Sequence, residues 1–202
     1  NHLIKSALMC KHKNPRFAYI APTFKQAKSI AWDYMKQFTA KIPATRFNET
    51  ELRVDLPNGA RITLLGAENS DGLRGIYLDG CVIDEYANID GKLFAEIIRP
   101  ALSDRKGYCV FIGTPAGMNN NFYDLYQHAN GADDWFNYKA KASDTKIVDP
   151  EELEKAREVM GEKKYLQEFE CDWIANIEGA IFGDEVAKLD DKKQLARVPY
   201  DP

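Results

Sequence analysis

Short apolar runs alternate with longer segments of helical spacing along most of this sequence. Residues 16–22, 81–83 and 107–113 are predicted to be buried strands, because each is short and apolar and ends at a polar or glycine-rich turn. Between them, two segments carry apolar stripes of helical period. Strands that alternate with helices favour an α/β fold: a mostly parallel sheet with helices on both faces. The stripes comprise Phe24, Ala27, Ile30, Ala31, Tyr34, Met35 and Phe38, then Phe94, Ile97, Ile98, Ala101 and Leu102, with Asp90 a candidate N-cap of the second.

A β-hairpin insertion is predicted at residues 51–66, where apolar and polar residues alternate on both sides of Asn58-Gly59, a typical turn pair. The C-terminal part of the chain is predicted to be a helical appendage. The residues after it show no clear helical or strand periodicity. We therefore expect one domain over residues 1–175 and a linker over residues 176–202. The remaining predicted elements are helices at 1–10 and 122–129, a strand near 135–142, and two helices between Glu151 and Trp173.

Composition excludes several classes of protein. The 202 residues are 45% hydrophobic and 29% charged, which is ordinary for a globular domain. No apolar run approaches the roughly 20 residues of a membrane helix, so no membrane partner is expected. A net charge of −4 argues against a broad nucleic-acid-binding face, so any DNA contact must be local or supplied by other parts. The four cysteines and three histidines show no ligand spacing, which favours free, buried thiols over disulfides or zinc.

Two adjacent carboxylates, Asp84 and Glu85, follow the apolar residues Cys81-Val82-Ile83. Neighbouring side chains at a strand end point in different directions, so one carboxylate could hold Mg²⁺ while the other deprotonates an attacking water. Four apolar residues followed by Asp-Glu are also the pattern of the second nucleotide motif, Walker B, of P-loop ATPases. The alternative is that these acids only cap the next helix.

A second strand-end motif, Gly113-Thr114-Pro115, closes the apolar run at residues 107–113. Carboxyl ends of parallel strands meet at one edge of a sheet, where such folds bind their ligands. Thr114 could there sense the γ-phosphate or the water beside it, and Gly113 would loosen the backbone. The alternative is an ordinary strand-to-loop turn.

Arg74 lies in a polar loop between Gly72 and Gly75. The two glycines make the backbone flexible, so the loop could extend the Arg74 guanidinium away from the domain. An arginine of this kind could stabilise phosphoryl charge in the site of a neighbouring subunit. The alternative is a surface arginine in a flexible turn.

Five segments in this order and spacing resemble the ATPase domain of tailed-phage large terminase subunits, the motors that pump DNA into procapsids. They are "YIAPTFKQAKSIAWDY" (19–34), "GLRG" (72–75), "CVIDEYA" (81–87), "FIGTPAG" (111–117) and "QEFECDWIANIEGAIF" (167–182). The resemblance implies an ASCE-type P-loop ATPase fold, with residues 1–175 as the motor domain and 176–202 leading toward a nuclease domain. Segment "APTFKQA" would match a helicase-like motif, in which Thr23 and Gln26 receive no role.

The resemblance also implies ATP and Mg²⁺ as cofactors, with Asp84 holding Mg²⁺ through water and Glu85 as the catalytic carboxylate. Gly113 and Thr114 would contact the nucleotide and couple hydrolysis to movement, and Arg74 would act as a finger in trans. The implied partners are double-stranded DNA, the portal protein of the procapsid, the small terminase subunit and further copies of the chain in a ring. The implied location is the host cytoplasm.

One departure from the family pattern concerns the phosphate loop. No glycine-rich turn with Lys and Ser/Thr occurs in these residues, and the chain opens at Asn1 inside a predicted helix. We therefore expect a fragment, N-terminally incomplete, that hydrolyses ATP in the intact protein and poorly by itself. A helicase-like nucleic-acid-dependent ATPase and a non-catalytic docking fragment of the same fold remain alternatives.

Overall fold

The computed structural model describes residues 1–174, which form two compact units. The first, here called the sheet unit, comprises Asn1–Pro115 and Asn119–Asn137; the second, the helical unit, comprises Ala116–Met118 and, among the described residues, 138–174. The predicted linker at 176–202 lies outside the described residues, and the predicted domain boundary at residue 175 stays a prediction. Within the described part, no helix has the length and apolar character needed to cross a bilayer.

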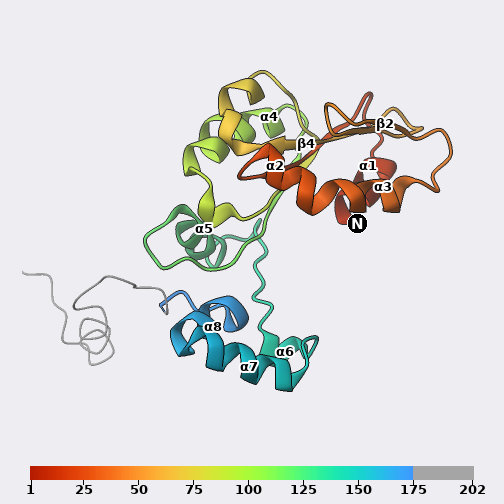
Figure 1. Ribbon diagram of the computed structural model, residues 1–202. Coiled ribbons are helices and arrows are strands. Elements are labelled where there is room, and N and C mark those ends of the chain that lie inside the picture. The colour runs from red at the N-terminus through yellow and green to blue at the C-terminus, as the bar shows by residue number, and fades with distance from the viewer. Residues whose placement is uncertain (175–202) are drawn as a thin grey trace, which may run out of the picture. The chain divides into compact units, whose positions relative to one another are not determined.

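The sheet unit is built on a six-stranded sheet in the order β2-β3-β4-β1-β5-β6. Figure 1 shows this unit, with β2 and β4 labelled. Strands β4, β1, β5 and β6 pair in parallel, whereas β2 and β3 join the β4 side by antiparallel pairing. The mostly parallel α/β sheet predicted from the sequence is therefore confirmed. The strands are β1 (Arg16–Ala21), β2 (Arg46–Asn48), β3 (Arg53–Asp55), β4 (Arg61–Gly66), β5 (Gly80–Ile83) and β6 (Tyr108–Phe111).

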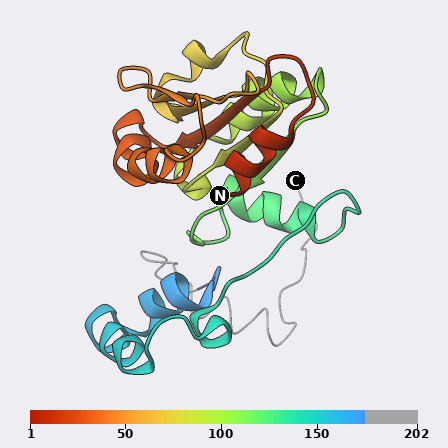
Figure 2. The ribbon, with the colours of Figure 1, turned by 90° about the vertical axis from the view of Figure 1, so that its right-hand side faces the viewer.

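Helices cover both faces of this sheet (Figure 2). Strand β1 shows why, because its alternate side chains enter two different cores: Phe17 and Ala21 one, Ala18 and Ile20 the other. The first core includes residues of α1 (His2–Met9), α2 (Phe24–Ala27), the π-helical turn η1 (Lys28–Trp32) and α3 (Asp33–Thr39). The second core includes residues of the 3₁₀ segments η2 (Ala67–Leu73) and η3 (Tyr86–Asn88), of η4 (Leu93–Ile98) and of α4 (Arg99–Ser103).

The predicted hairpin is confirmed as β3 and β4, which turn at Gly59 with a φ of +83°. An additional edge strand, β2, pairs with β3 and was not predicted. Its three residues are exposed or half-buried, and three residues are too few for an alternation that predicts a strand. Strand β6, predicted as buried, is only half-buried along its length because it lies at the other edge of the sheet.

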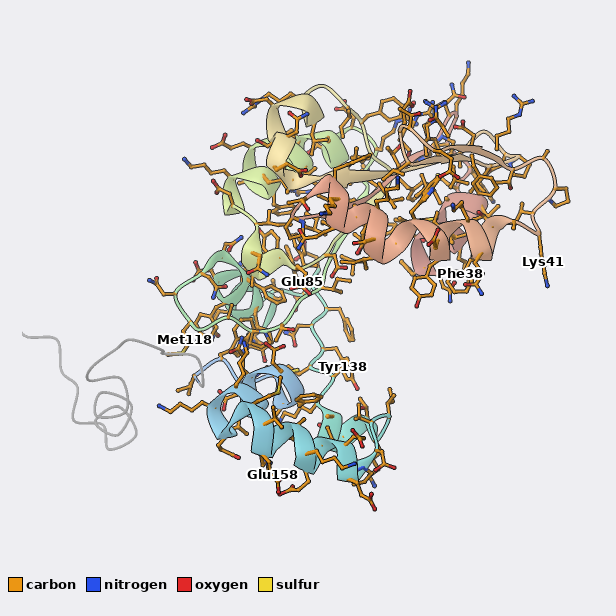
Figure 3. All side chains as sticks on the ribbon, viewed as in Figure 1. Phe38, Lys41, Glu85, Met118, Tyr138 and Glu158 are labelled. Carbon is orange, nitrogen blue, oxygen red and sulfur yellow. The ribbon has the colours of Figure 1, made fainter. Side chains whose placement is uncertain are left out.

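The predicted strand near residues 135–142 is wrong. The chain there is irregular up to α6 (Ala142–Thr145). Phe136 and Tyr138 (the latter labelled in Figure 3) are 88% and 71% exposed, so these aromatic side chains lack the burial that stabilises a strand. The preceding helix, α5 (Asn121–Ala129), was predicted. Asn120 is its N-cap, because the Asn120 side chain accepts hydrogen bonds from Phe122 N and Tyr123 N at 3.0 and 3.1 Å.

The helical unit contains the two predicted C-terminal helices, α7 (Pro150–Met160) and α8 (Glu162–Glu170). Asp149 caps α7 by accepting a hydrogen bond from Glu151 N at 2.8 Å. Gly161, with a φ of +77°, ends α7 because few other residues adopt this backbone conformation. The two helices pack through the Arg157 guanidinium, which lies 4.3 Å from the centre of the Tyr165 ring.

Candidate active site

The carboxyl ends of β5 and β6 bring two of the predicted motifs together. Ile83 of β5 is in register with Phe111 of β6, and Ile112 N donates a hydrogen bond to Ile83 O at 3.0 Å. Beyond the strands, Tyr86 N donates to Ile112 O at 3.1 Å, so the pairing continues past the acidic residues. The Asp84-Glu85 pair therefore lies beside the start of the Gly-Thr-Pro turn, at the edge where such sheets bind ligands.

Asp84 is held by hydrogen bonds on its backbone and on both carboxylate oxygens. Its backbone N donates to Ile20 O of β1 at 2.8 Å, and Oδ1 accepts from Glu85 N at 2.9 Å. The second oxygen, Oδ2, accepts a hydrogen bond from the Tyr19 hydroxyl. Burial, followed by the hydrogen bond to Asp84 and the negative charges of Asp84 and Glu85, raises the pKa of Tyr19 well above its ordinary value, so the phenol remains a donor.

Tyr19 was missed by the sequence interpretation. Within residues 17–21 of the predicted strand, it is the only residue whose side chain carries a hydrogen-bonding group, which is the signal that was available. That signal does not identify a partner, because Asp84 lies 65 positions away and reaches Tyr19 only through the pairing of β1 with β5.

Glu85 adopts a left-handed backbone conformation, with φ 51° and ψ 42°. This conformation is uncommon for a residue with a side chain and costs roughly 1–2 kcal/mol. The Glu85 carbonyl accepts from Asn88 N at 2.9 Å, and its Oε2 lies 3.4 Å from Asn88 Nδ2. In the described 3₁₀ turn η3, which Glu85 precedes, the carboxylate makes no capping hydrogen bond. Glu85 thus stands at the N-cap position of η3 without a side-chain capping bond to it, and the alternative that the two acids only cap the next helix stays open (Glu85 is labelled in Figure 3).

Gly113 contacts the backbone of the acidic turn closely. A Cβ added at this position would lie 3.2 Å from Tyr86 N and 3.5 Å from Glu85 Cα, and 3.4 Å from Phe122 Cε1. Glycine therefore allows the turn after β6 to approach Glu85. Thr114, the next residue, is half-buried. The structure thus brings Asp84, Glu85 and Gly113 together at one sheet edge, with Thr114 following directly.

Arg74 does not share contacts with that group among the described interactions. It follows η2, where its Nε donates to Asp71 Oδ1 at 3.2 Å and its Nη2 lies 3.7 Å from Glu96 Oε2. The Arg74 side chain is 56% exposed. Exposed ion pairs of this kind contribute about 0–1 kcal/mol, so the guanidinium can leave them at little cost. Its predicted role requires a second subunit and stays a prediction.

The oxygen donors at the sheet edge fit a hydrated Mg²⁺. Mg²⁺ prefers carboxylate oxygens and usually keeps several of its waters. Asp84 offers a half-buried carboxylate at a strand end, and its two hydrogen bonds leave acceptor positions on both oxygens. Asp84 therefore has the oxygen-donor chemistry that a hydrated Mg²⁺ requires.

A second cluster lies at the amino end of β5. Cys10, His12 and Asp79 offer ligand atoms within 4.8 Å of one another. Asp79, with a side chain only 2% exposed, already accepts from Arg16 N at 2.7 Å and pairs with His12 Nδ1 at 2.6 Å. The Arg105 guanidinium lies 4.0 Å from the same carboxylate. These donors compensate the buried charge of the Asp79 carboxylate. The cluster therefore links the start of β1 to the start of β5 through hydrogen bonds and ion pairs.

A mostly parallel sheet with helices on both faces and an Asp-Glu pair at the end of an interior strand place the chain in the α/β class. Within that class, the sequence model of the family described as "Terminase large subunit, T4likevirus-type, N-terminal" matches residues 3–188. The chain belongs to this terminase large subunit family. The family match favours the terminase expectation over the helicase-like alternative.

Curated relatives agree with this assignment. The large terminase subunit of Thermus virus P23-45 is 32% identical over 126 residues, which are 53% of this chain and 26% of that protein. The large terminase subunit of Thermus phage G20c is 31% identical over 126 residues, with the same coverage of 53% and 26%. The chain therefore matches about a quarter of the length of these relatives.

Solved structures share the fold. The ATPase domain of the Thermus phage P74-26 large terminase matches with a TM-score of 0.68 and 22% identity, covering 83% of this chain and 80% of that one. The large terminase of another thermophilic bacteriophage matches with a TM-score of 0.70 and 14% identity, covering 85% and 43%. The same protein in complex with ADP matches with a TM-score of 0.65 and 16% identity, covering 81% and 42%. At these identities the likeness shows the fold alone.

Proposed function

We propose that this chain is part of the ATPase motor of a DNA-packaging terminase, coupling ATP hydrolysis to the translocation of double-stranded DNA into a procapsid. The proposal rests on family membership together with one observation: Asp84 and Glu85 lie at the end of β5, directly beside Gly113 at the end of β6. Its partners would be DNA, the portal protein of the procapsid, the small terminase subunit and further copies of the chain in a ring, all in the host cytoplasm.

The two carboxylates take different roles because their surroundings differ. Asp84 is fixed at both oxygens, which suits a residue that holds Mg²⁺ through water. When bound, Mg²⁺ neutralises the charge that develops on the β- and γ-phosphates. Glu85, at the strand end beside Gly113, is the candidate to orient a water molecule and accept its proton. As the water oxygen bonds to the γ-phosphorus, the bond from that phosphorus to the β–γ bridging oxygen breaks and ADP leaves. Gly113 and Thr114 would follow the state of the γ-phosphate from the neighbouring strand end.

Replacing the proposed base by its amide tests this function. In the full-length protein, Glu85→Gln should reduce ATP turnover by about 10²–10⁴-fold, because the amide keeps the shape but cannot accept the proton. Nucleotide binding, measured by fluorescence of a labelled ATP, should remain close to that of the unchanged protein. Glu158→Gln, at an exposed position on α7 (Figure 3), is the matched control and should leave turnover unchanged.

Near-normal turnover by Glu85→Gln would overturn the assignment of Glu85 as the base. Absence of Mg²⁺-dependent turnover in the unchanged full-length protein, with and without DNA, would instead favour the non-catalytic docking alternative. Stimulation of turnover by duplex DNA is expected if hydrolysis is coupled to translocation.

A further inference from the structure

Tyr19 and Asp84 lie on one face of the sheet as diagonal neighbours on adjacent strands. Tyr19 of β1 is in register with Val82 of β5, and Asp84 follows Val82 by two residues. Side chains two positions apart on a strand point to the same face, and diagonal neighbours are within reach of a long side chain. The Tyr19 hydroxyl accordingly reaches Asp84 Oδ2 and donates a hydrogen bond to it.

The Asp84 carboxylate is fixed at both ends as a result. Glu85 N holds Oδ1 at 2.9 Å, and the Tyr19 hydroxyl holds Oδ2. A carboxylate has about four acceptor positions, so these two donors determine its plane and leave positions on each oxygen for water. Glu85 N comes from the turn that Asp84 itself begins, whereas Tyr19 is the donor supplied by a different strand.

We propose that Tyr19 is a positioning residue that sets the orientation of the Asp84 carboxylate toward the hydrated divalent cation of the nucleotide. The inference rests on the proposed function, because it assumes that Asp84 is the residue that holds this cation. Residues that hydrogen-bond to a metal-holding carboxylate fix its orientation, and their loss typically reduces metal affinity by about 10–100-fold.

A purely structural role for Tyr19 makes a different prediction. The Tyr19 ring packs against the core that contains Phe17 and Ala21, and phenylalanine would keep that packing. If only packing matters, Tyr19→Phe changes nothing at the site. If the hydroxyl orients Asp84, Tyr19→Phe frees Oδ2 and allows the carboxylate to rotate.

The experiment measures cation binding without turnover. Mn²⁺ replaces Mg²⁺, and its binding to the full-length protein in the presence of ADP is titrated by electron paramagnetic resonance. Tyr19→Phe should weaken Mn²⁺ binding by about 10–100-fold, with the thermal midpoint of the metal-free protein unchanged. Tyr77→Phe is the matched control, because the Tyr77 hydroxyl also donates a hydrogen bond, to Asn14 O at 2.9 Å, but precedes β5 at its opposite end.

Asp84→Asn and the Tyr19→Phe/Asp84→Asn double variant complete the set. The double variant should bind Mn²⁺ like Asp84→Asn alone, because Tyr19 acts through Asp84. If Asp84→Asn weakens binding but Tyr19→Phe does not, or if Tyr77→Phe weakens it equally, only the role of Tyr19 is overturned. If Asp84→Asn binds Mn²⁺ as the unchanged protein does, the proposed role of Asp84 fails and the inference fails with it.

Discussion

At the scale of residues, Asp84 and Glu85 are half-buried and are held in place by hydrogen bonds or by the backbone conformation. Asp84 has three hydrogen-bonded groups, and Glu85 is held in a left-handed conformation by the turn that follows β5. Backbone strain of this kind persists only where the surrounding structure enforces it, and it gathers at functional sites. Arg74 is the contrasting case, because its exposed ion pairs with Asp71 and Glu96 constrain it weakly.

The trans role of Arg74 predicts complementation between two inactive variants. Arg74→Ala in the full-length protein should reduce ATP turnover by about 10³–10⁵-fold, since arginine fingers contribute rate factors of that size. Mixing Arg74→Ala with Glu85→Gln should restore activity, because at some interfaces an intact Arg74 then meets an intact Glu85. Turnover is measured on procapsids or DNA, where subunits assemble.

Arg99→Ala, at an exposed arginine of α4, is the control and should leave turnover unchanged. A surface arginine without function predicts little loss from Arg74→Ala in the first place. A finger that acts within its own subunit predicts loss without recovery on mixing, which would contradict the trans assignment.

At the scale of elements, the π-helical turn η1 explains why a regular helical period predicts the wrong buried face for part of residues 24–38. Four residues of the predicted stripe are exposed, namely Phe24, Ile30, Tyr34 and Phe38. Ala27 and Met35 are buried as predicted, together with Trp32 and Thr39, which lie outside the stripe. The π-helical turn η1 lies between α2 and α3 and contains one more residue per turn than an α-helix would. This extra residue rotates α3, so the face that packs on the sheet changes along the helix.

The junction between β5 and β6 gives a prediction at the same scale. Gly113→Ala would place a Cβ 3.2 Å from Tyr86 N, which is backbone and must shift by a few tenths of an ångström. Such a shift displaces Glu85, and because a misplacement of about 1 Å can cost about 10²-fold in rate, kcat should fall by about 10-fold. Gly131→Ala, where an added Cβ meets nothing within 4 Å, should leave kcat unchanged.

The thermal midpoint of Gly113→Ala should stay near that of the unchanged protein, since the contact lies in a turn at the sheet edge. Equal kcat values for Gly113→Ala and Gly131→Ala would show that the approach of the two turns does not position Glu85.

At the scale of the whole molecule, the site in these 202 residues contains strand-end carboxylates but no glycine-rich loop with Lys and Ser/Thr. Backbone N–H groups and the lysine of such a loop hold the β- and γ-phosphates in P-loop ATPases. This chain by itself should therefore release phosphate from Mg²⁺-ATP at close to the background rate, whereas the proposed function requires that the full-length protein turn over ATP. Phosphate release measured over a range of ATP concentrations checks this, and brisk, saturable turnover by the chain alone would contradict it.

Local patterns in the amino-acid sequence were enough to predict the fold class, the hairpin, most of the helices and the acidic pair, because each depends on a local period or on a short motif. The sheet order, the edge strand β2, the irregular chain near residue 136 and the partnership of Tyr19 with Asp84 became visible only in the folded chain. Local patterns record which face of an element is apolar, but not which strand lies beside it. Tyr19 and Asp84 meet because β1 pairs with β5, and that pairing depends on contacts between residues far apart in the chain.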